Sequence, residues 1–421
     1  MTLYIPDKPD DKRKAVLAGI CEKNSISRFE RAMKECAALC EACNIETAAV
    51  ITQNSRTADP STAFRSGKLE ELCRLVAETD AGLIVFYNTL SVKSAQRIAE
   101  ITGVPVIDRV SLILDIFSQR ARTKQAKLQT EMARLQYDLP RVMQSDNNAG
   151  HERGGSAYNR GAGEMRSQVI QRKYRERITD LKKELKRIEV QRTQDEARRS
   201  KTLLGRAAMV GYTNAGKSSL MNALLRLSSG SGTEVMEKDM LFATLDTSVR
   251  MISINRKAYL FYDTVGFVSD LPHTLVEAFR STLDAARDAD LLVHVIDSSD
   301  PEWEDKAAIT EDTLKSIGAD DIPVLRVFTK TDLVEETVRP DGICVSSLTG
   351  EGVFELSNAI VSRLYPAEKE YSCLLPYAES RLIERYKSIC TIDILESSDD
   401  GYLIHVSGPE YAADAFRKYA Q

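Results

Sequence analysis

The sequence lacks any long apolar run and any recognisable export signal. No hydrophobic stretch approaches the ~18 residues that span a bilayer. The N-terminus, MTLYIPDKPDDKRK, has neither the apolar core nor the small-residue cleavage site of a signal peptide. We therefore expect a cytoplasmic protein with no membrane span.

The sequence also lacks a complete set of cysteine ligands for a metal. Its eight cysteines are scattered, and three of them, Cys36, Cys40 and Cys43, have helical spacing in one apolar stretch. A structural metal cluster at these positions needs a fourth ligand, and none lies near them in the sequence. Reduced, partly buried thiols are the better interpretation.

The charge is unevenly distributed along the chain. The formal net charge is −5, yet residues 120–201 carry 21 Lys or Arg against 11 Asp or Glu. The remaining residues carry 36 Lys or Arg against 51 Asp or Glu. A basic segment in an otherwise acidic protein suggests a polyanionic partner.

The basic segment has the pattern of a helical hairpin. Leu128, Met132, Leu135 and Leu139 form one apolar stripe, and Ile178, Leu181, Leu185 and Ile188 form another. Two such stripes suit an antiparallel coiled coil. Between them lies Asn147–Glu164, NNAGHERGGSAYNRGAGE, which is rich in Gly, Arg and Asn and is predicted to be a flexible, non-helical tip.

The strongest motif is Gly211-Tyr-Thr-Asn-Ala-Gly-Lys-Ser218, a complete phosphate-binding loop. It follows the apolar run 207–210 and precedes a helical pattern over 217–226, which is the strand–loop–helix context that the motif requires. The glycines let backbone N–H groups converge on phosphate oxygens, and the helix N-terminus adds a favourable dipole. Lys217 is predicted to reach the β- and γ-phosphates, and Ser218 to bind Mg²⁺.

Two further segments have the order and spacing of the switch regions of a nucleotide hydrolase. Asp263-Thr-Val-Gly266 follows a strand pattern, so that Asp263 would hold Mg²⁺ through water and the Gly266 N–H would sense the γ-phosphate. Upstream, Phe242-Ala-Thr-Leu-Asp246 supplies Thr244 as the expected second Mg²⁺ ligand. Thr247 is the rival for that role.

Two later segments predict a guanine base. Thr329-Lys-Thr-Asp332 follows the strand pattern 324–328 at the place of an N-K-x-D motif. The Asp332 carboxylate can accept hydrogen bonds from guanine N1–H and N2–H₂, which adenine does not offer together, so GTP is favoured over ATP. Asn normally braces this loop against the phosphate loop, and Thr329 in its place is expected to weaken affinity without changing base choice. Ser346-Ser-Leu348 fits the last motif, whose backbone contacts the guanine O6.

These motifs define one predicted site for GTP and GDP. Catalysis is assigned to Lys217, Thr244 and Gly266, and Mg²⁺ binding to Ser218 and Thr244, with Asp263 acting through water. The predicted GTP-binding residues are Gly211, Tyr212, Thr213, Asn214, Ala215, Gly216, Lys217, Ser218, Ser219, Phe242, Ala243, Thr244, Leu245, Asp246, Asp263, Thr264, Val265, Gly266, Thr329, Lys330, Thr331, Asp332, Ser346, Ser347 and Leu348.

The residue after the Asp263–Gly266 switch is Phe267, where many such enzymes have a Gln that orients water. Because Phe267 cannot position water, we expect slow intrinsic hydrolysis. A partner, a loop rearrangement or a monovalent cation must complete the site. Asn214 occupies the position at which related GTPases bind K⁺.

The chain is therefore predicted to be an α/β protein with four parts. Alternating strand and helix patterns over residues 15–108 predict a small parallel sheet with covering helices. The predicted parts are an N-terminal α/β domain (1–110), a basic helical hairpin (111–202), a P-loop GTPase domain (203–366) and a C-terminal α/β appendage (367–421).

Several of these segments together resemble the HflX family of GTPases. The resemblance rests on GYTNAGKSSLMNAL, FATLDTSVR, DTVGFVSDLPHTLVEAFRSTL, RSGKLEEL (65–72), the basic hairpin and GAGE (161–164), and it covers nearly the whole chain. The family's Gly-Pro-Gly-Glu is Gly161-Ala-Gly-Glu164 here, its Asp-Arg-Arg is Gln171-Arg-Lys173, and its usual Pro is Thr247. The chain is thus similar to a divergent member.

The resemblance implies a GTPase that binds the large ribosomal subunit and splits or rescues stalled ribosomes. The hairpin would approach ribosomal RNA, and Arg153, Arg160 and Arg166 around its tip suit RNA phosphates. The alternative is a switch that docks a protein effector through its coiled coil. Some family members bind ATP in the N-terminal domain, where Gly67 and Lys68 could contact a phosphate, although Gly-Lys at a helix start is common by chance. We expect a monomer.

Overall fold

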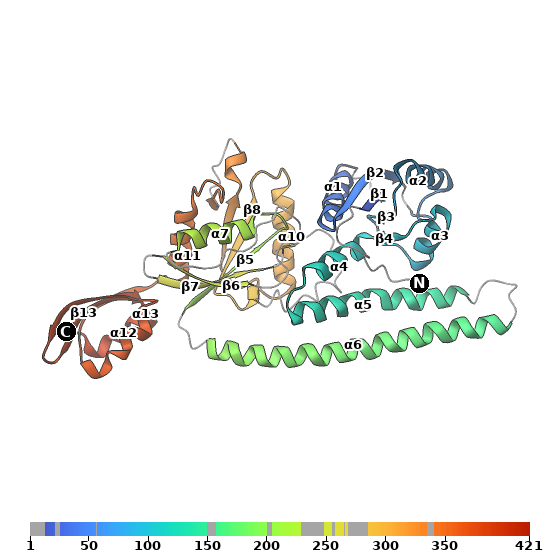
Figure 1. Cartoon of the computed structure of the whole chain (residues 1–421). Coiled ribbons are helices and arrows are strands. Elements are labelled where there is room, and N and C mark those ends of the chain that lie inside the picture. The colour runs from blue at the N-terminus through green and yellow to red at the C-terminus, as the bar shows by residue number, and fades with distance from the viewer. Residues whose placement is uncertain are drawn as a thin grey trace. The chain divides into compact units, whose positions relative to one another are not determined.

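The computed structural model describes most of the chain (Figure 1). It covers residues 13–21, 26–55, 57–149, 157–199, 204–228, 248–254, 257–264, 266–267, 285–334 and 341–421. The chain divides near residue 188 into two compact units. No helix in these stretches is both long enough and apolar enough to cross a membrane.

The first unit begins with a four-stranded parallel sheet of order β2-β1-β3-β4. Its central strand β1 is buried along most of its length, because both faces are covered by helices. The elements are β1 (Arg13–Cys21), α1 (Ile26–Ala42), β2 (Ile45–Asn54), α2 (Ser66–Thr79), β3 (Leu83–Phe86), α3 (Val92–Thr102) and β4 (Val106–Asp108). The predicted parallel α/β sheet is confirmed.

The three clustered cysteines lie on α1 as free, buried thiols. Burial raises the pKa of Cys43, and its Sγ donates to the Leu112 carbonyl at 3.7 Å. The Cys36 pKa is also raised, first by a hydrogen bond with Cys40 and then by burial. Cys36 and Cys43 are therefore core residues with little thiolate character.

The predicted helical hairpin is present. It comprises α5 (Lys124–Ala149) and α6 (Ala157–Arg199), preceded by α4 (Arg109–Arg120). The Arg177 guanidinium contacts Glu131 at 2.7 Å and Lys124 contacts Glu184 at 3.8 Å, so the two helices run antiparallel, as Figure 1 shows. Leu128, Ile178 and Leu181 from the predicted apolar stripes are buried.

One prediction about the hairpin is wrong. The segment Asn147–Glu164 was expected to be non-helical, but α5 continues to Ala149 and α6 begins at Ala157, while residues 150–156 lie outside the described residues. Each Gly in α6 costs about 1 kcal/mol relative to Ala. That cost is small beside the propagation of a helix of 43 residues, which begins with several good helix formers. Arg153 lies outside the described residues, as do the side chains of Arg160 and Arg166.

A buried carboxylate attaches α5 to the N-terminal sheet. Asp108 at the end of β4 accepts hydrogen bonds from the Ser111 N–H (3.0 Å), the Tyr137 hydroxyl (2.5 Å) and the Arg141 guanidinium (2.7 Å). Arg141 also donates to the Leu90 carbonyl at 2.8 Å. The middle of α5 is thus held at the carboxyl end of this sheet.

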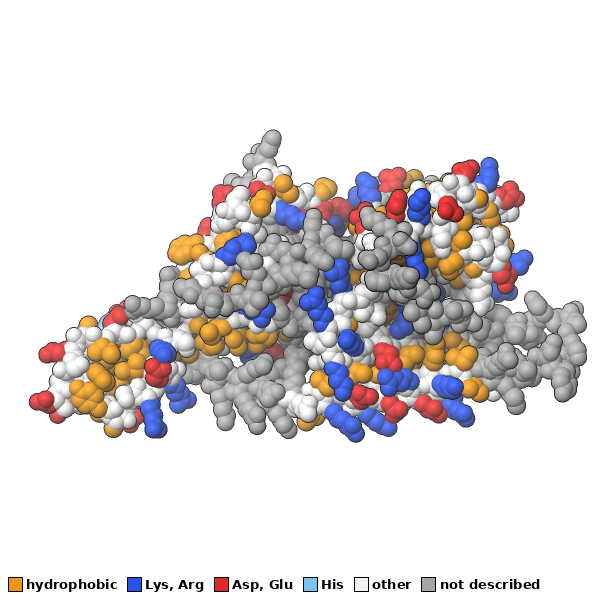
Figure 2. All heavy atoms as spheres, viewed as in Figure 1, with side chains coloured by type: hydrophobic (Ala, Val, Ile, Leu, Met, Phe, Trp, Pro, Cys, Tyr) orange, Lys and Arg blue, Asp and Glu red, His pale blue; other side chains and the backbone are white. Residues whose placement is uncertain are grey.

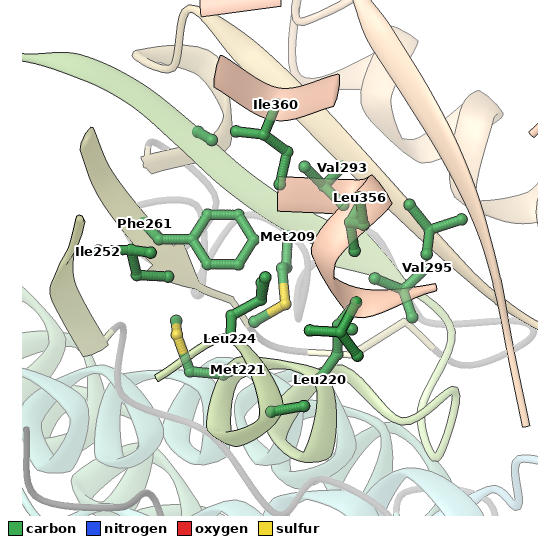
Figure 3. Close-up of a cluster of buried hydrophobic side chains, with 14 of the residues drawn as sticks. Met209, Leu220, Met221, Leu224, Ile252, Phe261, Val293, Val295, Leu356 and Ile360 are labelled. Atoms are coloured by element: carbon green, nitrogen blue, oxygen red, sulfur yellow. The ribbon is translucent and has the colours of Figure 1, made fainter. Parts of the chain in front are cut away.

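The second unit contains a six-stranded sheet of order β10-β9-β8-β5-β7-β6, in which only β6 is antiparallel to its neighbour. The core between this sheet and helices α7 and α11 includes Met209, Leu224, Phe261 and Ile360 (Figure 3). The elements are β5 (Gly205–Gly211), α7 (Lys217–Leu227), β6 (Ser248–Ile254), β7 (Lys257–Asp263), β8 (Leu291–Asp297), α10 (Trp303–Ser316), β9 (Val324–Thr329), β10 (Ile343–Cys344) and α11 (Val353–Leu364).

The chain ends in a small antiparallel sheet of order β11-β13-β12, packed on short helices through Ile404, Val406 and Phe416. Its elements are β11 (Glu368–Leu375), α12 (Arg381–Tyr386), β12 (Thr391–Ser398), β13 (Gly401–Pro409) and α13 (Glu410–Ala413). In β11 only Cys373 and Leu375 are buried. The expected α/β fold class is confirmed, since a parallel α/β sheet, a helical hairpin, a P-loop sheet and a small antiparallel sheet follow one another along the chain.

Candidate functional site

The phosphate-loop sequence connects β5 to α7 in a conformation that only its glycines permit. Gly211 has φ +152°, and a Cβ there would lie 2.3 Å from the Val295 carbonyl oxygen. Gly216 has φ +84° and Asn214 has φ 61°, both in the left-handed region. The loop therefore wraps tightly around the N-terminus of α7, where backbone N–H groups attract anions.

Lys217 is the first residue of α7 and is buried beneath this loop. Its Nζ donates to the carbonyls of Gly211 at 3.1 Å and Tyr212 at 2.7 Å. Burial lowers the pKa of Lys217 to about 8, against the opposing attraction of Asp263. An anion bound in the loop would restore the charged form of this lysine.

Ser218 and Asp263 bring two hard oxygen donors together beside the loop. The Ser218 hydroxyl donates to Asp263 Oδ2 at 3.2 Å, and Asp263 is fully buried at the end of β7. The next residue, Thr264, is anchored by its hydroxyl to the Met209 carbonyl of β5. A hydroxyl and a carboxylate are ligands that Mg²⁺ prefers, so the donor set fits that ion.

The backbone of Gly266 and Phe267 lies directly against the loop. A Cβ on Gly266 would lie 2.8 Å from Lys217 Nζ and 2.8 Å from Thr213 Cα. The Phe267 N–H donates to the Gly211 carbonyl at 3.1 Å, and the Thr213 N–H donates to the Phe267 carbonyl at 2.7 Å. The Phe267 ring is buried and has no polar atom, so it offers nothing to orient a water molecule.

Thr329, at the end of β9, connects the predicted base-reading loop to the phosphate loop. Its buried hydroxyl lies 2.7 Å from the Ala215 carbonyl and 3.1 Å from the Ile296 carbonyl. Ser298 donates its N–H to the Thr329 carbonyl at 3.0 Å. The brace that an Asn side chain would make in this motif is therefore made here by a hydroxyl.

Asp332 is an exposed carboxylate held in position by Ser346. The Ser346 hydroxyl donates to Asp332 Oδ1 at 2.6 Å, and its oxygen accepts from the Thr349 N–H at 3.1 Å. Lys330, with φ 58°, pairs with Asp297 at 2.8 Å. Ser347 is half-buried and Leu348 is 85% exposed. The Ser346 side chain thus orients the acidic residue, a role that the motif analysis did not assign.

The sequence analysis also missed Asp297. This residue ends β8, the strand next to β9, and its Oδ1 accepts from the Ser299 N–H at 3.0 Å. Carboxyl ends of neighbouring parallel strands meet at one edge, so the position of Asp297 after an apolar strand could have identified it.

Part of the predicted site falls outside the described residues. This applies to Phe242, Ala243, Thr244, Leu245, Asp246, Thr247 and Val265. In the N-terminal sheet, Lys68 on α2 pairs with Glu71 at 2.9 Å, and a Cβ on Gly67 would meet no atom within 4 Å.

Three family models match successive parts of the chain. Residues 30–118 match a model described as GTP-binding GTPase N-terminal, and residues 120–199 match a GTP-binding GTPase middle region. Residues 206–330 match a model described as a 50S ribosome-binding GTPase.

Curated relatives are similar over most of their length. GTPase HflX of Caldanaerobacter subterraneus subsp. tengcongensis is 36% identical over 376 residues, which is 88% of this chain and 85% of the relative. GTPase HflX of Alkalihalophilus pseudofirmus is 32% identical over 404 residues, 94% of each chain. A solved structure of a GTP-binding protein from Sulfolobus solfataricus in complex with GDP has 23% identity and a TM-score of 0.46, covering 83% of this chain and 99% of that one.

Proposed function

Because the chain belongs to the HflX family of GTPases, we propose that it hydrolyses GTP on the large ribosomal subunit and there splits or rescues stalled ribosomes. The observation that carries the proposal is one chain that combines a phosphate loop, a Ser218 hydroxyl bonded to the buried Asp263 carboxylate, and a basic hairpin. The ribosomal part is supported by the match of residues 206–330 to a 50S ribosome-binding GTPase model.

In the proposed reaction, the phosphates of GTP lie along the loop 211–216 and against Lys217. Bound Mg²⁺, held by Ser218 and Thr244 and by Asp263 through water, would neutralise charge that develops on the phosphate oxygens. The Gly266 N–H, beside Lys217, would contact the γ-phosphate, which requires the backbone bonds between Phe267 and the phosphate loop to rearrange. K⁺ at Asn214 would add a second cation.

Base choice follows from Asp332. The Ser346 hydroxyl donates a hydrogen bond to Asp332 Oδ1. Because Asp332 is exposed, its carboxylate would still be accessible to the N1–H and N2–H₂ groups of guanine. The Thr329 hydroxyl bonds to the phosphate loop, so the distance between the site for the base and the site for the phosphates would be fixed.

Because Phe267 carries no group that orients water, the attacking water must be positioned from outside the isolated site. We propose that the large subunit does this, so that hydrolysis is coupled to ribosome binding.

The hairpin supplies the proposed RNA contact. One stretch of α6 exposes seven basic side chains to solvent, which favours phosphate contacts over an apolar docking face. These residues are Arg172, Lys173, Arg175, Lys182, Lys183, Lys186 and Arg187. Arg153, Arg160 and Arg166 at the predicted tip would add to them.

The experiment that tests this contact is co-sedimentation with purified large subunits over a range of salt concentrations. Replacing Arg153, Arg160 and Arg166 with Ala should flatten the slope of log affinity against log salt by roughly two to three. The control triple variant, with Lys315, Arg381 and Lys387 replaced by Ala, should keep the wild-type slope. If the tip variant binds like wild type, the hairpin is a protein-docking coiled coil instead.

A further inference from the structure

The C-terminal sheet has one edge covered and one edge open. The last residues of the chain cover β11, through a bridge between Cys373 and Ala420 and a bond from the Gln421 N–H to the Ser372 carbonyl (3.0 Å). At the other edge lies β12, which pairs only with β13 among the described strands. Its outer backbone edge can therefore accept a further strand.

Apolar side chains are exposed along this open edge. Ile394 is 53% exposed and Leu395, the extra residue of a bulge, is 61% exposed. At the end of the same strand, where Ser397 pairs with Tyr402, Tyr377 and Tyr402 form an edge-to-face pair 4.7 Å apart, and the Tyr377 hydroxyl donates to the Ser398 carbonyl at 2.7 Å. Figure 2 shows hydrophobic side chains gathered over the C-terminal part, at the left of the view. We call Tyr377, Ile394, Leu395 and Tyr402 the edge patch.

β12 and the turn that follows it carry charge of one sign. Residues 388–416 contain six Asp or Glu and no Lys or Arg, and β12 and its turn contribute Asp393, Glu396, Asp399 and Asp400. Open edges are usually protected by Lys or Pro, and β12 has neither. Acidic side chains repel RNA phosphates, and they also repel the same edge of a second copy of the chain. A basic polypeptide is the partner that this charge attracts.

We propose that β12 binds an extended basic segment of a partner protein as an added strand. The partner's backbone would bond to the outer edge of β12, and alternate side chains would face the edge patch. Its Lys or Arg side chains would lie near Asp393 and Glu396. The bulge at Leu395 limits regular pairing to the residues on either side of it, so the bound segment is short.

The test uses the full-length protein and a fluorescein-labelled octapeptide of alternating Val and Lys. Fluorescence polarisation should show saturable binding of this peptide. The corresponding Val–Glu peptide should bind at least tenfold more weakly, and so should a Val–Lys peptide that is N-methylated at every second residue and cannot complete the strand bonds. Equal binding of the N-methylated peptide would show attraction by charge alone and would overturn the proposal.

Two variants locate the binding to this edge. Leu395→Lys places a protective charge on the strand and should weaken binding of the Val–Lys peptide at least tenfold, while GTP turnover stays at the wild-type rate. Ile101→Lys, at an exposed apolar site on α3, adds the same charge elsewhere and should bind like wild type. Unchanged binding in Leu395→Lys would contradict the proposal, as would a wild-type dimer that Leu395→Lys dissociates.

Discussion

At the scale of single residues, Lys217 shows how burial prepares the site for phosphate. Its ammonium is removed from water and contacts two backbone carbonyls, which compensate only in part for the lost hydration. The result is a lysine with a pKa of about 8 instead of 10.5. Binding of a polyanion must then be linked to protonation of this residue.

This linkage predicts how affinity depends on pH. A lysine with a pKa of about 8 is mostly charged at pH 7 and mostly neutral at pH 8.5. Because phosphate requires the charged form, GDP affinity should fall about fourfold between these two pH values. Isothermal titration calorimetry would measure it, with guanosine, which lacks phosphates, as the control that should show no such change. A GDP affinity that is constant or rises over this range would contradict the assignment.

Thr329 provides a second test at a single side chain. Thr329→Val keeps the shape but leaves the buried Ala215 carbonyl without its donor, at a cost of about 1–3 kcal/mol. Nucleotide affinity should fall about tenfold for GTP and GDP alike, since the brace contacts neither base edge nor γ-phosphate. Thr329→Ser retains the hydroxyl and should bind like wild type. Stopped-flow measurement of mant-nucleotide dissociation would show the difference, and a Val variant with wild-type rates would exclude the brace.

Sequence reasoning was effective where a motif dictates backbone geometry and weak where a side chain bonds across the fold. The loop at 211–218 was identified from its complete motif between a strand pattern and a helix pattern, and the structure shows why Gly211 is required: a Cβ there would lie 2.3 Å from the Val295 carbonyl oxygen. Thr329 was seen only as a departure, since its bond to Ala215 joins residues 114 positions apart. The Ser346–Asp332 bond was missed for the same reason: a motif names the residues but not which of them contact each other.

At the scale of elements, the carboxylate at the end of β4 determines where α5 lies. Asp108 is 1% exposed and accepts hydrogen bonds from the first turn of α4 and from α5. The burial of this carboxylate depends on those donors. Helix periodicity predicted α5 itself, whereas its attachment to β4 could not be read from local sequence. The Gly-rich composition of residues 157–164 led us to predict a non-helical segment, but α6 already begins at Ala157. The stability gained by extending a long helix outweighed the cost of its glycines.

The attachment predicts a local change in stability. Arg141→Met removes the only cation bonded to buried Asp108 among the described contacts and should destabilise the first unit by about 3 kcal/mol. Tyr137→Phe removes a neutral donor and should cost about 1 kcal/mol. Calorimetry with GDP would separate the two units, since GDP raises only the transition of the unit that binds it. The proposed attachment is wrong if Arg141→Met does not lower the temperature of the unfolding transition that GDP leaves unchanged.

At the scale of the whole molecule, one chain carries a nucleotide site with an apolar side chain at Phe267 and a hairpin with a basic surface. Phe267 has no polar atom and is buried, so this position cannot orient a water molecule. Basic side chains along α6 are exposed to solvent. The proposed function accounts for both features: the basic surface of the hairpin binds the ribosome, and the ribosome completes the GTPase site.

The most direct test is the rate of GTP turnover with and without purified ribosomal subunits. The account predicts slow turnover by the protein alone, at least a tenfold increase with large subunits, and little increase with small subunits. Lys217→Ala should abolish turnover in every case, which controls for contaminating GTPases. Turnover that is already fast in isolation, or that responds equally to both subunits, would contradict the central claim.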